Sequence, residues 1–252
     1  MLTRRSNLSA SDDASAKPTS LVVQRSKLQA QDLKDLFEHK IIALHVPSFY
    51  PRASAMELGQ ALALEAQSDS DSSTDGSGRK NWKVSTARGL ESSDVFTLGA
   101  HMPWNMAVSQ NAIEDYLKRV PVEFQNRRRR MKGNDKWLLA DSIWPLDQLR
   151  LELDEVWPAG ANLSKYKKQH AMGGGLPRIM MGPTRWKKGL IHVDELGPLN
   201  VNKGCFSANI YLQLPNHQED GENSEPVLDI WPLDIRSKWD WYRVSSRLSP
   251  RA

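Results

Sequence analysis

The sequence predicts an α+β fold, with helices in its first part and strands in its second. Up to about residue 156, apolar residues recur every three or four positions, as in amphipathic helices. From about residue 176 the apolar runs become short, and glycine, proline or asparagine separates them, which is typical of strands and turns. Hydrophobic residues make up 39% of the 252 residues, so a packed core is expected.

The N-terminal region is expected to begin with a disordered tail over residues 1–20, because this stretch is rich in serine and has no apolar core. The folded domain is expected over 21–252. Its first helix is predicted from four residues that fall roughly on one face: Leu28, Leu33, Leu36 and Phe37. The apolar run 41–46 then predicts a short buried strand, which Pro47 ends.

A second helix is predicted from Ser54 to Ala66. Ser54 is a candidate N-cap, and Glu57 three residues later would complete a capping box. The segment Ser68 to Lys80 contains no apolar residue and cannot contribute to a core. We therefore expect a disordered surface loop over 68–80.

Three further helices are predicted before the strands begin. The first runs from about Gln110 to Val120 and is interrupted by Pro121. The second, Val122 to Met131, ends in four consecutive arginines, and the third runs from Leu146 to Val156. The strands of the β-rich part, from about residue 176, are predicted at Arg178 to Met181, Gly189 to Val193, Phe206 to Leu214 and Val227 to Trp231.

Composition excludes several classes of protein. The single cysteine, Cys205, rules out a disulfide framework within the chain and favours a reducing, cytoplasmic location. No apolar run reaches the roughly 20 residues of a membrane helix, so no membrane partner is expected. The net charge of +4 is modest, and the run Arg127–Arg130 has no stacking aromatics in a nucleic-acid-binding pattern. Nucleic acid is therefore not expected, although a basic polyanion-binding module stays open as an alternative.

The clearest chemical motif is His192-Val193-Asp194 in the predicted strand from Gly189. Side chains alternate along a strand, so His192 and Asp194 would point the same way. An imidazole and a carboxylate on one face can take two adjacent positions around a metal, as in the two-histidine, one-carboxylate triad of non-haem iron oxygenases. On spacing alone, a surface strand end with a His–Asp hydrogen bond is the alternative interpretation.

The region from Lys80 to Tyr242 resembles the 2-oxoglutarate- and iron(II)-dependent oxygenase superfamily. The matching sequences are PRIMMGPTRWKKGLIHVDELGPLN, FSANIYLQLP and VLDIWPLD, in that order, with SDVFTLG upstream. The resemblance implies a helical N-terminal region packed on a double-stranded β-helix, or jelly-roll. It also implies that iron(II) and 2-oxoglutarate are used to hydroxylate a small-molecule substrate.

The resemblance further implies that His192 and Asp194 are metal ligands. Asn209 and Tyr211 lie at positions i and i+2 of the next predicted strand, where polar residues can hydrogen-bond 2-oxoglutarate. Tyr211 could equally be a core aromatic residue with a satisfied hydroxyl.

The third metal ligand of this family, a distal histidine followed by an arginine, is not evident. After Asp194 the sequence contains one histidine, His217, within a polar segment typical of a hairpin loop. Only the first four or five of about eight jelly-roll strands can be placed, so we expect an incomplete jelly-roll. The alternatives are therefore a fragment or a catalytically inactive relic, and we expect little activity from this chain.

Overall fold

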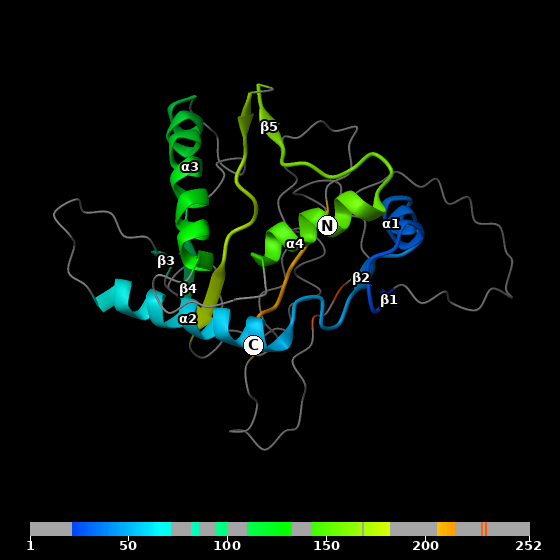
Figure 1. The fold of residues 1–252 in the computed structure, drawn as a ribbon, viewed down its shortest axis with the longest axis horizontal. Coiled ribbons are helices and arrows are strands. Elements are labelled where there is room, and N and C mark those ends of the chain that lie inside the picture. The colour runs from blue at the N-terminus through cyan, green and yellow to red at the C-terminus, as the bar shows by residue number, and fades with distance from the viewer. Residues whose placement is uncertain are drawn as a thin grey trace, which may run out of the picture.

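The computed structural model describes residues 22–71, 82–85, 94–99, 110–132, 143–167, 169–181 and 206–214, with Leu228 and Ile230. Within these residues, four helices and three small sheets form a mixed helix and strand fold (Figure 1). The predicted combination of helices and strands is confirmed. The described strands form no closed barrel, so the double-stranded β-helix stays a prediction. The predicted tail, 1–20, lies outside the described residues.

The described part of the chain starts with a small β-α-β unit. Strands β1 (Val22–Gln24) and β2 (Ala43–His45) pair in parallel, and helix α1 (Ala30–Phe37) connects them. The predicted first helix is confirmed, and so is the first strand, although β2 is shorter than predicted and none of its residues is buried. Strand β1 was not predicted. Arg25 donates to the buried carboxylate of Asp32 at 2.9 Å. This ion pair ties α1 to the end of β1.

Helix α2 (Arg52–Asp71) begins earlier than predicted. It follows Pro51, whose carbonyl accepts a 2.8 Å hydrogen bond from the amide of Ala55. Ser54 therefore lies inside the first turn, and its predicted role as N-cap is wrong. A proline just before a helix explains the early start, because its fixed φ suits a helix beginning.

Helix α2 also ends later than predicted, since residues 68–71 are helical rather than part of a loop. The Ser68 hydroxyl donates to the Leu64 carbonyl at 2.9 Å, one turn back. A polar helix end needs no buried surface when the preceding turns are packed, so the absence of apolar residues was not sufficient to predict a loop. The remainder of the predicted loop, 72–80, lies outside the described residues.

Helix α3 (Gln110–Lys132) is continuous, and the predicted interruption at Pro121 is wrong. Proline lacks the N–H that would bond the carbonyl four residues earlier. Packing on both sides offsets this loss, because Tyr116 and Val120 are buried before the proline and Arg127 is buried after it. The next predicted helix is confirmed as α4 (Pro145–Val156), with Pro145 in its first turn.

The main sheet has the order β3-β4-β7 and is antiparallel throughout. Strand β7 (Arg178–Met181) was predicted, whereas β3 (Trp82–Ser85) and β4 (Asp94–Leu98) were not. Strand β7 forms an apolar run that follows glycine and proline, whereas no such turn residues directly precede β3 or β4. A short hairpin, β5 (Lys165–Tyr166) and β6 (His170–Ala171), precedes β7.

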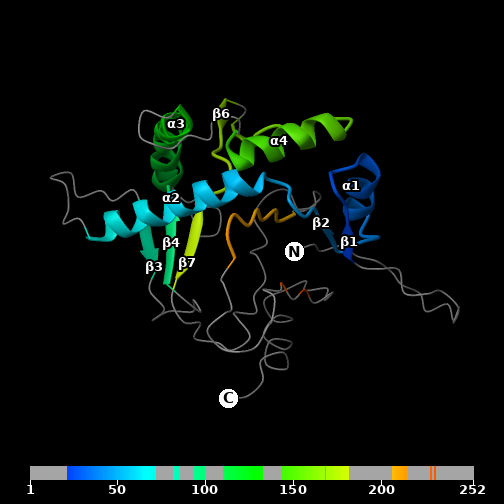
Figure 2. The same ribbon diagram turned by 60° about the horizontal axis from the view of Figure 1, so that its bottom comes forward.

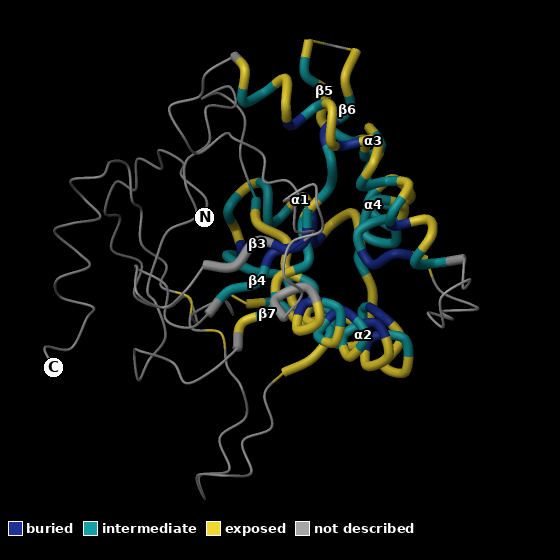
Figure 3. Tube along the Cα trace, turned by 90° about the vertical axis from the view of Figure 1, so that its left-hand side faces the viewer, coloured by how far each residue is buried: buried dark blue, intermediate teal, exposed yellow. Residues whose placement is uncertain are grey.

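The core lies where α2 crosses this sheet, beneath α3 and α4 (Figure 2). Residues of α2 spaced by one helical turn point into it. Its buried members are Leu58, Leu62, Ala66, Trp82, Leu98 and Trp144. Figure 3 shows buried and exposed positions alternating around α2. Among the described helices, none combines the length and the apolar character needed to cross a membrane.

The contribution of this core can be measured on α2 itself. Leu62 is 3% exposed and Leu64 is 64% exposed, so the two leucines form a matched pair on one helix. We expect Leu62→Ala to lower the free energy of unfolding by about 2–5 kcal/mol, because it opens a cavity. Leu64→Ala should change it by less than about 0.5 kcal/mol. Urea unfolding followed by circular dichroism tests this, and equal effects of the two substitutions would contradict the packing described.

Candidate functional site

The predicted metal ligands, His192 and Asp194, lie outside the described residues, as does His217. The predicted strand Gly189 to Val193 lies outside them as well. Within the described ranges, no group of three or more histidine, cysteine, aspartate or glutamate side chains could hold a metal ion. The His–Asp pair therefore stays a prediction from the sequence.

The predicted 2-oxoglutarate-binding residues, Asn209 and Tyr211, lie together on the described segment 206–214. This segment is not a strand, and that prediction is wrong, because no described strand pairs with it. Its burial nevertheless alternates: Asn209 and Tyr211 are exposed, whereas Ile210 and Leu212 are partly buried. Tyr211 is 57% exposed, which excludes a core role for its ring. Asn209 and Tyr211 are thus both accessible to solvent.

Contacts at both ends hold segment 206–214 against two helices. The ring centroid of Phe206 is 4.6 Å from that of Phe37 on α1. At the other end, Gln213 donates through Nε2 to the Met56 carbonyl on α2 at 3.0 Å. A Cβ at Gly59 would lie 2.8 Å from the Gln213 side chain, so a larger residue there would displace Gln213. In the sequence, the feature that indicates this close contact is Gly59, a single glycine within a helical pattern.

The four consecutive arginines of α3, Arg127–Arg130, have different environments. Arg127 is buried, at 8% exposed. Arg130 forms two hydrogen bonds to the Glu65 carboxylate on α2, one of them 3.1 Å from Nε to Oε2. Arg128 and Arg129 are exposed. Two of the four cations therefore hold α3 against the rest of the fold, which sequence reasoning missed because the run looked uniformly solvated.

Arg127 is a buried cation with three neighbours. Its guanidinium carbon lies 5.4 Å from the ring centroid of Phe124 and 5.7 Å from that of Trp144, within the range of cation–π attraction. Its Nη2 donates to the Gly175 carbonyl at 3.0 Å. Burial lowers the pKa of Arg127, whereas the carboxylate of Asp147 acts in the opposite direction. The side chain stays charged at neutral pH because a guanidinium ionises only far above it.

Arg127 contacts the last of three consecutive glycines, Gly173–Gly175, and Tyr116 contacts the first. The amide of Gly173 donates to the Tyr116 hydroxyl oxygen at 2.9 Å. A Cβ at Gly173 would approach that oxygen to 3.1 Å, so a larger residue would push the hydroxyl away. Tyr116 and Arg127 on α3 thus hold residues 173–175, which lead directly into β7. This arrangement positions a strand of the main sheet and contains no residue set typical of catalysis.

Comparison of the chain with known protein families, with curated proteins and with solved structures gave no match. Any function must therefore be argued from the residues themselves.

The role of Arg127 can be separated from that of its charge. We expect Arg127→Met to lower the free energy of unfolding by about 1.5–3 kcal/mol, because the Gly175 carbonyl loses a charged donor. Arg128→Met removes the same charge from an exposed position and should change it by less than about 0.5 kcal/mol. Denaturant unfolding of both variants at neutral pH is the measurement. Equal losses would mean that net charge, rather than the buried contact, is responsible.

Tyr116 predicts a pH dependence of stability. Burial raises the pKa of its phenol, although the hydrogen bond from Gly173 partly opposes this shift. In the unfolded chain the phenol ionises near about pH 10. The folded state favours the neutral form, so stability is fully present below that pH and is lost as pH rises towards the folded pKa. We expect this alkaline loss to be smaller in Tyr116→Phe, measured by unfolding between about pH 8 and 11. Identical slopes for the two proteins would refute this role.

Proposed function

We propose that this protein is a non-haem iron(II)- and 2-oxoglutarate-dependent oxygenase that hydroxylates a small molecule. The observation that carries the proposal is the pair His192 and Asp194, two residues apart in a predicted strand. The pair follows a helical region and a sheet, β3-β4-β7, whose last strand immediately precedes it in the chain. The resemblance of the surrounding sequence to this superfamily supports the same assignment.

The donor atoms of His192 and Asp194 are of the types that bind iron(II). A neutral imidazole and a carboxylate are two of the three ligands of the facial triad, which leaves positions open for 2-oxoglutarate and dioxygen. Iron(II), when bound, supplies dioxygen activation coupled to oxidative decarboxylation of 2-oxoglutarate to succinate. The His–Asp pair would hold the ion from one side. Asp194 also supports hydroxylation over halogenation, because its carboxylate occupies the place that a chloride would need.

The exposed residues Asn209 and Tyr211 are a second line of support for the proposal. An exposed amide and an exposed phenol two residues apart can donate hydrogen bonds to a carboxylate. Contacts of Phe206 with α1 and of Gln213 with α2 hold this segment at its ends. The backbone that carries the two donors is therefore held before the co-substrate binds, which reduces the entropy lost on binding.

The basic polyanion-binding alternative is less favoured. It requires the arginines of α3 to act together, but Arg127 and Arg130 are engaged within the fold. The outward-facing Lys118 also lies beside an acid, since its Nζ is 3.6 Å from Asp115. The exposed side of α3 thus combines both signs of charge, whereas phosphate backbones select continuous positive surfaces.

The proposal is tested first by metal binding. We expect anaerobic titration with iron(II) and 2-oxoglutarate to produce a weak visible absorption band. His192→Ala should weaken iron binding by about tenfold or more, because it removes a direct ligand. His170→Ala is the matched control, since His170 is an exposed histidine of β6. The same titration of His217→Ala shows whether that histidine is the third ligand.

Succinate release in air then separates an active enzyme from a relic. Iron binding that depends on His192, together with succinate release, would support the proposed oxygenase. Iron binding without succinate would favour an inactive relic of such an enzyme. Absence of any iron-dependent band, or equal binding by His192→Ala and the unsubstituted protein, would overturn the proposal.

A further inference from the structure

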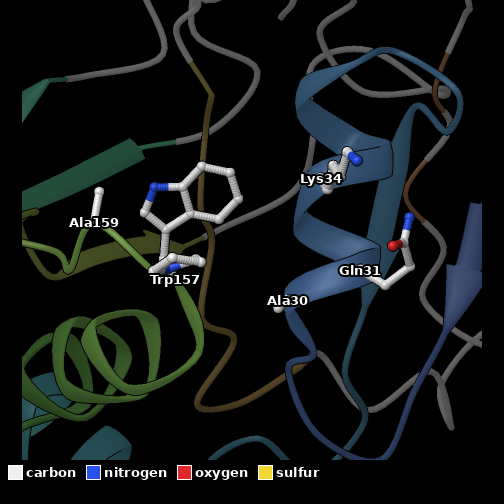
Figure 4. Close-up of a pocket in the computed structure, with 6 residues that line it drawn as sticks. Ala30, Gln31, Lys34, Trp157 and Ala159 are labelled. Carbon is white, nitrogen blue, oxygen red and sulfur yellow. The ribbon is translucent and has the colours of Figure 1, made fainter.

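A hollow of about 270 Å³ lies between α1 and the turn that follows α4 (Figure 4). Its lining is largely apolar and comes from two short stretches of chain: Ala30, Gln31, Lys34, Trp157, Pro158 and Ala159. Sites for drug-sized ligands commonly occupy about 300–1,000 Å³. This hollow therefore suits a molecule of one or two rings, and neither Asn209 nor Tyr211 lines it.

Trp157 forms a fixed apolar wall of this hollow. Its ring packs edge-on against Phe37, with centroids 4.7 Å apart, and Phe37 packs in turn against Phe206. The Trp157 backbone is held as well, because its amide donates to the Leu153 carbonyl and its carbonyl accepts from Gly160. A ring held by one aromatic neighbour and by its own backbone loses little further freedom when a flat ligand stacks on it.

Lys34 places a loosely held positive charge at the hollow. Its Nζ lies 3.9 Å from the Glu38 carboxylate, at the limit of an ion pair, and its side chain is 57% exposed. Glu38 has a closer partner in Lys40, at 2.8 Å, and the hydrogen bond from Lys40 is the main cause of its lowered pKa. An incoming anion would therefore compete with a weak contact rather than with a tight pair.

We propose that this hollow binds a small aromatic carboxylate, with its ring against Trp157 and its carboxylate at Lys34. The apolar wall formed by Trp157 favours a ligand with a flat apolar ring, and the Lys34 ammonium favours a ligand with a negative charge. The hollow is partly open to solvent, so a ligand can enter it. The proposal is independent of iron binding and does not rest on the oxygenase assignment.

The test compares two ligands that differ only in charge, indole-3-acetate and indole-3-acetamide. Binding is followed at low salt by the indole N–H signals of the ¹⁵N-labelled full chain, with the Trp157 signal assigned by its loss in Trp157→Phe. The assignment is needed because the chain has nine tryptophans. We expect the Trp157 signal to shift, and the carboxylate to bind about two- to fivefold more tightly than the amide, as one exposed ion pair allows.

Two lysine variants localise the charge effect. Lys34→Gln should bring the carboxylate-to-amide ratio to about one, since the ion pair is gone. Lys118→Gln should leave the ratio unchanged, because Lys118 is also a helical lysine with a nearby carboxylate, 3.6 Å away, but lies on α3. A ratio of one in the unsubstituted protein would overturn the proposal. So would an unchanged ratio in Lys34→Gln, or a Trp157 signal that does not move with either ligand.

Discussion

Packing of α2 against the antiparallel sheet is the constraint on which the rest of the fold depends. Leu58, Leu62 and Ala66 lie one turn apart on this helix and are almost fully buried. They meet residues of the sheet and Trp144 at the start of α4. The core is therefore built from elements that are distant in the sequence. Each surface feature, including the glycine segment before β7 and the extended segment 206–214, is held by helices that this core places.

Local signals in the sequence were sufficient for some elements and insufficient for others. Helix α4 and strand β7 were predicted because proline, glycine and apolar runs mark their ends. Pro121 was expected to break a helix, but the buried Tyr116 and Arg127 on either side keep α3 continuous. Tertiary packing of this kind overrides local propensity and cannot be derived from a window of one segment.

The candidate site shows the same division. The prediction that Asn209 and Tyr211 face the same way stays a prediction, because both are exposed and their segment has no strand partner among the described residues. Adjacent charges were less informative, since the sequence could not distinguish Arg127, which is buried, from Arg128, which is exposed. The difference depends on where each falls around α3 relative to the core. The angular position of a residue around α3 decides its burial only once the surfaces that pack against the helix are known.

The hydrogen bond between Gln213 and Met56 joins residues 157 positions apart. During synthesis on the ribosome, the β-α-β unit can form as soon as residues 22–45 have emerged, because its contacts are local. The inner side of α2 is covered later, because its buried partners extend to Trp144. Nascent chains with such a delay expose apolar surface and are prone to aggregate. The interval between synthesis of α2 and of Trp144 is therefore the stage at which this helix exposes its apolar side, whereas the contact of Gln213 is added only after the core has closed.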